Sequence, residues 1–251
     1  MENKLKFKKV GGVEIFEFFG NLTGAFAAKS LEAMERALRA QRGGFVLFNV
    51  QFVDSIDSGG MAALFRIADQ TEKKAFLLGG NGILETLKRN NLDQKWTLFS
   101  SPEEATYFFS REFAIKSDFY MESERRQFLR LKTVLPLRFS PTNAQAGGFE
   151  FFSVVTNLSE GGLFAEFIDS VSETKVDEIL QPYGIYELRL QLFLSPNEKI
   201  YMQGQKVHGG AMEGGVGIAF TDMEIKTRER LRAWIEGHLV QHPEARNGQE
   251  H

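Results

Sequence analysis

Short apolar runs alternate with amphipathic stretches along roughly the first 110 residues. Apolar and polar alternation, or a short apolar run, predicts strands over residues 4–10, 13–19, 45–50, 75–78 and 96–98. Apolar positions at helical spacing predict helices over residues 25–41, 60–71, 83–90 and 102–109. Strands and helices that alternate in this way favour an α/β sheet domain.

The second half has a different pattern, with strand-like alternation and one terminal helix. Strands are predicted over residues 131–139, 149–155, 163–168 and 214–220, and the middle two are expected to join at a turn. The segment 227–240 has one apolar face, made of Leu231, Trp234, Ile235 and Leu239. This half is therefore predicted to be a second domain, rich in strands.

Composition narrows the classes of function. The 251 residues suffice for two domains, and the absence of cysteine excludes disulfide scaffolds, thiol catalysis and cysteine-ligated zinc. A net charge of −3 argues against broad binding to DNA, so an anionic ligand would need a local basic patch. The 24 phenylalanines lie mostly in strand-like segments, which favours core filling over a partner surface.

Several other kinds of chemistry are not expected. The four histidines lack ligand-like spacing with carboxylates, which argues against a metal site. No phosphate-binding loop and no nucleophile elbow occur, so neither an enzyme nor a cofactor is predicted. The first ten residues lack the apolar core of a signal peptide, and no run is long enough to span a bilayer. The prediction is a cytoplasmic protein without membrane insertion.

Two polar signatures stand either side of strand-like sequence. Arg126 and Arg130 are separated by three residues, with Arg125 beside them, and residues 157–162 read Asn-Leu-Ser-Glu-Gly-Gly. Arginine is a planar, permanently charged donor that suits phosphates and guanine edges. Taken alone, the arginines could be one solvated helix face and the second motif an ordinary turn.

The order of these signatures, with the 214–220 strand and the terminal helix, resembles the PilZ domain, which binds the bacterial messenger cyclic di-GMP. The resemblance covers roughly residues 120–240. It implies an all-β barrel with a C-terminal helix. Asn157 and Ser159 could hydrogen-bond the ligand, while Gly161 and Gly162 allow positive φ and close backbone approach. The candidate ligand-binding residues are Arg125, Arg126, Arg130, Asn157, Ser159, Gly161 and Gly162.

Residues 53–64 follow a buried strand and open a helix. They resemble the STAS domain of anti-sigma-factor antagonists, in which Asp-Ser-(Ser/Thr)-Gly-Leu begins a helix and the serine after Asp is phosphorylated. Asp57, Ser58 and Gly60 match this pattern, while Gly59 and Met61 depart from it. A phosphate on Ser58 would be stabilised by free backbone N–H groups and would change the charge of a docking face. Equally, Asp57 or Ser58 could be an ordinary N-cap.

Together these patterns predict an α/β STAS-like domain over residues 1–112, a connector over 113–124, a PilZ-like barrel over 125–241 and a disordered tail over 242–251. We expect a regulator that binds cyclic di-GMP and relays this to a protein partner, such as an anti-sigma factor or kinase. The alternatives are an adaptor that binds no nucleotide, with arginines in salt bridges, and an antagonist switched by phosphorylation of Ser58.

Overall fold

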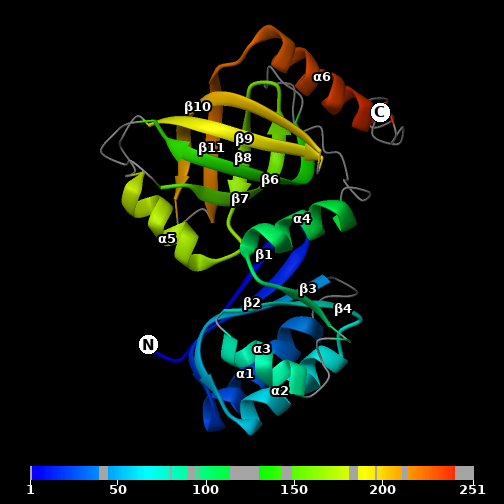
Figure 1. Ribbon diagram of the computed structural model, residues 1–251, viewed down its shortest axis with the longest axis vertical. Helices are drawn as coiled ribbons and strands as arrows, with labels where there is room; N and C mark the ends of the chain where they lie inside the picture. Colours follow the sequence, from blue (N-terminus) through cyan, green and yellow to red (C-terminus); the bar gives the residue numbers. More distant parts are fainter. Residues whose placement is uncertain are drawn as a thin grey trace, which may run out of the picture. The chain divides into compact units, whose positions relative to one another are not determined.

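The computed structural model describes residues 2–39, 45–79, 81–89, 94, 96–113, 130–142, 149–180, 186–195, 197–210 and 214–240. The chain divides into two compact units, Met1–Ala105 and Thr106–His251 (Figure 1). The first unit is a sheet with helices, and the second is a barrel with helices.

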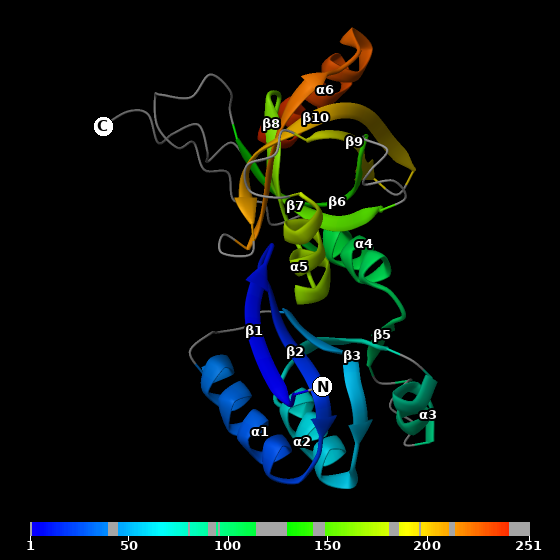
Figure 2. The same cartoon turned by 90° about the vertical axis from the view of Figure 1, so that its left-hand side faces the viewer.

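Five strands form the sheet of the first unit, in the order β1-β2-β3-β4-β5. The strands are β1 Lys4–Val10, β2 Val13–Leu22, β3 Phe45–Ile56, β4 Lys73–Leu77 and β5 Thr97–Phe99. The helices between them are α1 Gly24–Arg39, α2 Ser58–Asp69 and α3 Asn81–Arg89. β1 runs antiparallel to β2, and the other neighbours are parallel. The predicted α/β domain is thus confirmed (Figure 2).

A row of aromatic rings crosses this sheet on the face that packs against the helices. Phe16, Phe48 and Phe76 are register partners on β2, β3 and β4, with ring centroids 6.0 and 4.9 Å apart. Trp96 continues the row, 4.5 Å from Phe76. The three phenylalanines are at most 1% exposed. Core filling therefore accounts for this part of the phenylalanine content.

β3 is longer than predicted. Its sequence suggested a strand ending at residue 50 followed by a turn, but the strand continues to Ile56. The added residues pair with the end of β2, where Phe19 is opposite Phe52 and Leu22 is opposite Ile56. Pairing with a neighbouring strand thus extends β3 up to the residue before Asp57. The α2 helix accordingly begins two residues earlier than predicted, at Ser58.

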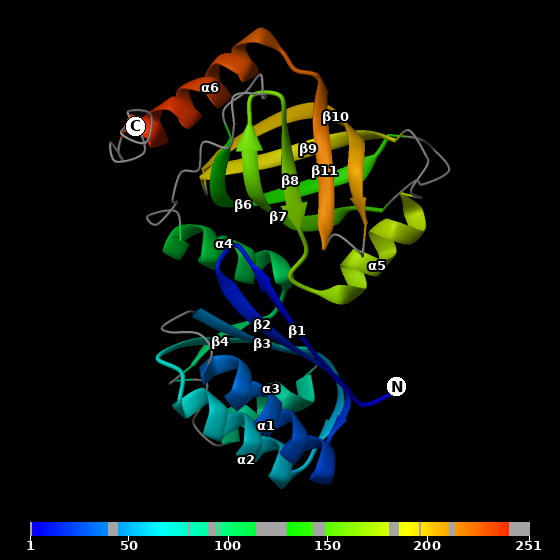
Figure 3. The same cartoon turned by 180° about the vertical axis from the view of Figure 1, so that it is seen from behind.

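The second unit contains a closed barrel of six strands, in the order β10-β11-β8-β7-β6-β9 (Figure 3). These are β6 Leu131–Pro141, β7 Phe151–Ser159, β8 Gly162–Glu166, β9 Glu187–Ser195, β10 Glu198–Gly210 and β11 Gly215–Asp222. All pairs are antiparallel. The helices of this half are α5 Ser170–Ile179 and α6 Ile225–Val240. The predicted β-barrel with a C-terminal helix is confirmed, whereas α5, β9 and β10 had no prediction.

α5 and α6 lie at opposite ends of the barrel and pack against its core (Figures 1 and 3). Leu231 and Ile235 of α6 are 0% and 4% exposed, as their predicted apolar face requires, and Trp234 packs partly buried beside them. The side chain of Leu239 lies outside the described residues. These contacts anchor α6 on the barrel.

α4, Pro102–Phe113, spans the division between the two units, which falls between Ala105 and Thr106. In the second unit, the Tyr107 ring of this helix contacts Phe193 of β9 at 5.2 Å and Phe152 of β7 at 6.2 Å. Phe193 is 1% exposed although the alternation of β9 directs it away from the barrel core. The predicted domain limits remain predictions, and the predicted connector beyond Phe113 and the predicted tail lie outside the described residues.

Candidate functional site

The pairing of β6 with β7 brings the two polar signatures of the second unit together. Leu131 is opposite Leu158, and Lys132 is opposite Asn157. Arg130 directly precedes β6 and is exposed, and the same register continued by one residue would set it opposite Ser159. Arg125 and Arg126 lie outside the described residues. One arginine of the first signature therefore adjoins the second signature.

Asn157 and Ser159 lie on a strand and not in a loop, because β7 continues to Ser159 and leaves only Glu160 and Gly161 between it and β8. Asn157 is half-buried. Ser159 is 8% exposed, and its hydroxyl donates to the Gly162 carbonyl at 3.0 Å. The Phe220 N–H donates to the Gly161 carbonyl, also at 3.0 Å. The turn is thus held by its own serine and by β11.

Gly162 is required for close approach and not for an unusual backbone angle. A Cβ atom at Gly162 would lie 2.4 Å from the Ile218 carbonyl oxygen of β11, which is closer than such atoms come. Positive φ angles occur at other described glycines, such as Gly214 at 71°, but neither at Gly161 nor at Gly162. Positive φ and close backbone approach were both expected of these glycines. This turn uses only the close approach, at Gly162.

Residues of both positive and negative charge lie at this turn. Arg130 and Lys132 are exposed cations at the start of β6. Glu160 is the acidic residue of the turn, and its Oε2 accepts hydrogen bonds from Nε and Nη2 of Arg232 on α6, at 3.0 and 2.7 Å. This hydrogen bond, together with the charge of the same carboxylate, raises the pKa of Arg232 above its ordinary value. Arg232 is therefore a permanent cation beside the turn.

In the first unit, Asp57 caps two helices at once. Its Oδ1 accepts from the Gly60 N–H at 2.7 Å, and its Oδ2 accepts from the Gly24 N–H, the first residue of α1, at 3.2 Å. Ser58 is exposed at the first position of α2. Of the two possible capping residues, Asp57 fills the role and Ser58 does not.

The two glycines after Ser58 differ in the space around them. A Cβ atom at Gly60 would lie 1.9 Å from the Leu22 carbonyl oxygen, so the end of β2 contacts the helix backbone there. At Gly59 the nearest atom would be Asp57 Oδ1 at 3.3 Å. Glycine is therefore sterically obligatory at Gly60, which matches the STAS pattern, whereas at Gly59, which departs from it, a Cβ atom would need only a small shift of the Asp57 side chain.

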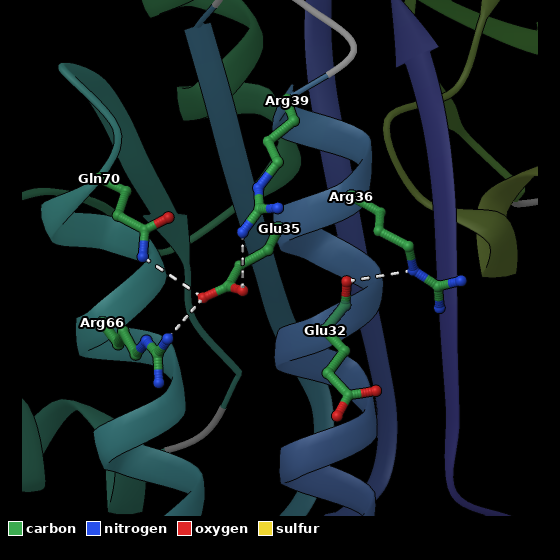
Figure 4. A network of polar contacts seen from close by, with 6 residues as sticks. All are labelled: Glu32, Glu35, Arg36, Arg39, Arg66 and Gln70. Atoms are coloured by element: carbon green, nitrogen blue, oxygen red, sulfur yellow. Dashed lines mark hydrogen bonds and ion pairs between the residues drawn. The ribbon is translucent and has the colours of Figure 1, made fainter.

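A second carboxylate ties α1 to α2 further along the helices. The Glu35 carboxylate forms ion pairs with Arg66 at 3.2 Å and Arg39 at 3.7 Å, and it accepts a hydrogen bond from the Gln70 amide at 3.4 Å (Figure 4). Glu35 is 15% exposed, so this network is partly shielded from water. Asp57 joins the helices where they begin and Glu35 joins them where they end, so the two run in the same direction. Ser58 is thus presented on a firmly held helix pair.

Comparison with known families assigns both halves. A sequence model of the STAS domain matches residues 4–105, and one of the PilZ domain matches residues 124–237. The chain is a STAS domain followed by a PilZ domain. PilZ domains form a family of cyclic di-GMP receptors, and the presence of a PilZ and a STAS domain in one chain supports a signalling adaptor.

Solved structures resemble one domain or the other. A PilZ domain of CeSA from a cellulose-synthesizing bacterium is 14% identical, with 43% of this chain and 95% of that chain covered and a TM-score of 0.32. An anti-sigma factor antagonist from Mycobacterium paratuberculosis is 13% identical, with 41% and 91% covered and a TM-score of 0.38. The PilZ domain of YcgR from Escherichia coli, with c-di-GMP, is 13% identical, with 49% and 99% covered and a TM-score of 0.36. No curated protein sequence matches the chain.

The sequence did not point to Arg232 as part of the PilZ turn. It lies 72 positions after Glu160, in a helix that was identified only by its apolar face. Spacing along the chain holds no signal for such a pair. Within the described ranges, acidic residues and histidines form no cluster that could hold a metal ion, and no helix there is long and apolar enough to cross a membrane.

Proposed function

We propose that this chain is a cytoplasmic bacterial signalling protein without catalytic activity. Its PilZ domain binds cyclic di-GMP, and its STAS domain relays this event to a protein partner. The observation that carries the proposal is the register between β6 and β7, in which Lys132 is opposite Asn157. Because Arg130 directly precedes β6, this register brings it to the motif turn.

The chemistry of the turn suits this ligand. Cyclic di-GMP has two phosphodiester charges and guanine edges that accept hydrogen bonds, and arginine donates to both. In the proposed complex Arg126 and Arg130 bind phosphates and guanine edges, with Arg125 adding charge. Asn157 contacts guanine, and Ser159, whose hydroxyl donates its proton to Gly162, accepts a hydrogen bond from a guanine N–H group. Gly161 and Gly162 leave the part of the turn after Glu160 free of side chains.

Calorimetric titration of the full chain with cyclic di-GMP tests the ligand, with GTP as the control nucleotide. Arg130→Ala and Arg126→Ala should each weaken binding about thirtyfold, because a charge-assisted hydrogen bond contributes about 2 kcal/mol. Arg138→Ala is the matched control, since this arginine lies on the same strand, near Glu150 at 3.7 Å, and outside both motifs. No heat of binding to the unaltered chain at tens of micromolar would favour the adaptor that binds no nucleotide.

A second measurement tests the same ligand through stability. Cyclic di-GMP at a hundred times its dissociation constant should stabilise the PilZ domain by about 2.7 kcal/mol. Trp234 on α6 and Trp96 in the STAS domain are the two tryptophans of the chain. A Trp96→Phe variant would leave a fluorescence signal from the PilZ domain alone. An unchanged unfolding midpoint would contradict binding.

For the relay, we propose that the STAS domain docks an anti-sigma factor or kinase, and that phosphorylation of Ser58 is a second input. The exposure of Ser58 supports this, because Asp57 takes the capping role and leaves the hydroxyl at the surface. Mass spectrometry of the protein from its native cells should find phosphate on Ser58. Ser55, exposed but hydrogen-bonded to Asn21 at 2.6 Å, is the internal control. Phosphate on neither serine would remove this input.

A further inference from the structure

Glu160 is an acidic residue in the middle of a turn that we propose binds a doubly charged anion. Its side chain is 25% exposed, so water screens it only in part. A partly buried carboxylate beside Ser159 and Gly161 would repel the phosphates of the ligand. The proposed function therefore needs something in the fold that cancels this charge.

Arg232 meets that need. Two of its nitrogens donate to the same carboxylate oxygen of Glu160, at 3.0 and 2.7 Å. Its neighbour Leu231 is fully buried and Ile235 is 4% exposed, so α6 is fixed on the barrel core. The guanidinium is thus presented by a held helix and does not depend on a flexible loop.

We infer that Arg232 is a positioning residue for the anion site: it neutralises Glu160 and holds the 159–162 turn in its binding geometry. This inference rests on the proposed function of the PilZ domain. It makes α6 a component of the ligand site, although no residue of α6 belongs to either ligand motif. Through the ion pair between Glu160 and Arg232, ligand binding at the turn is coupled to the packing of α6 on the barrel.

The same helix provides a matched control. Arg230 forms an ion pair with Glu198 at 3.0 Å, at the beginning of β10. The Arg230 and Arg232 side chains are 50% and 51% exposed, so the two cations are similar in environment, while Glu198, at 42%, is more exposed than Glu160, at 25%. Glu198 lies outside the ligand motifs. Exposed ion pairs contribute little to stability, so neither pair should decide whether the domain folds.

The test is calorimetric titration with cyclic di-GMP of the full chain and of Arg232→Gln, Glu160→Gln, the double variant and Arg230→Gln. Arg232→Gln should weaken binding about tenfold, because it leaves the Glu160 carboxylate uncompensated. Glu160→Gln should bind at least as tightly as the unaltered chain. The affinity of the double variant should return to within about threefold of that of the unaltered chain. Arg230→Gln should not change the affinity.

Salt provides a readout that a purely structural role would not change. The loss in Arg232→Gln should shrink as sodium chloride rises from about 0.05 to 0.5 M, because screening weakens repulsion between Glu160 and the phosphates. Circular dichroism would confirm that each variant is folded. Failure of the double variant to recover affinity would overturn the inference and indicate that Arg232 contacts the ligand directly. Normal binding by Arg232→Gln would overturn it too, whereas no binding by the unaltered chain would overturn the proposed function as well.

Discussion

Each domain has a motif serine followed by two glycines within three residues, and the two serines are used in opposite ways. Ser58 is exposed at the first position of α2, where the neighbouring Asp57 carries out the capping. Ser159 is 8% exposed, and its hydroxyl is bonded to the Gly162 carbonyl. Similar residue types thus produce a surface hydroxyl in the STAS domain and a structural one in the PilZ domain. Local hydrogen bonding decides whether a hydroxyl can donate its proton to another molecule.

The glycines of the two turns, by contrast, play the same part. Gly60 lies against the Leu22 carbonyl and Gly162 lies against the Ile218 carbonyl, each too closely for a Cβ atom. In both turns a glycine allows one backbone to contact a neighbouring strand. The comparison teaches that glycine fixes the shape of each turn, while the partner of the serine sets its availability.

The largest expected effect comes from the glycines. Gly60→Ala should reduce the free energy of unfolding of the STAS domain by about 3 kcal/mol, because the new Cβ would overlap backbone that cannot move as a side chain can. Gly59→Ala, with its nearest neighbour at 3.3 Å, should change it by less than about 0.5 kcal/mol. Urea denaturation followed by Trp96 fluorescence in a Trp234→Phe background measures both. Equal effects of the two substitutions would show that contact with Leu22 does not restrict the turn.

Loss of the double cap should come next. Asp57→Ala removes the acceptor for the Gly60 and Gly24 N–H groups and should destabilise the STAS domain by about 1–2 kcal/mol. Asp57→Asn is the control, because the amide retains one oxygen that can accept from Gly60. Urea denaturation again provides the measurement. An Asp57→Ala variant as stable as the unaltered chain would contradict the capping role.

The two serines themselves should differ by a smaller margin. Ser159→Ala should destabilise the PilZ domain by about 1 kcal/mol, since the hydrogen bond to Gly162 is lost. Ser58→Ala should change the stability of the STAS domain by less than about 0.5 kcal/mol, because the side chain is exposed. Fluorescence-detected denaturation separates the domains when Ser159→Ala is measured in a Trp96→Phe background and Ser58→Ala in a Trp234→Phe background. A larger loss at Ser58 than at Ser159 would reverse the comparison.

The smallest expected effect concerns a buried carboxylate on β2. Burial raises the pKa of Glu14, and the nearby charge of Lys9 opposes this only in part. The folded state therefore holds the Glu14 proton more tightly than the unfolded state, so this residue lowers stability as pH rises above the unfolded value of about 4.5. Glu14→Gln should gain stability relative to the unaltered chain between pH 4 and pH 7, measured by thermal unfolding. A difference independent of pH would exclude this role for Glu14.

Much of the fold follows from local sequence. The alternation of apolar residues predicted β1, β2 and β6, and the apolar face of α6 predicted the burial of Leu231 and Ile235. The extension of β3 was missed, because its last residues are strand only through pairing with β2. The turn of the PilZ motif was placed too early for the same reason, since β7 continues through Asn157 while paired with β6 and β8.

By itself, the sequence determined the order of the two domains, the motif residues and the need for a local basic patch, because these depend on residue type and spacing. Only the tertiary structure decided that Asp57 caps two helices, that the Ser159 hydroxyl donates to Gly162 and that Arg232 neutralises Glu160. Each of those facts depends on groups that meet through strand pairing or helix packing. Residues 72 positions apart become neighbours only when burial of an apolar face fixes where the helix lies.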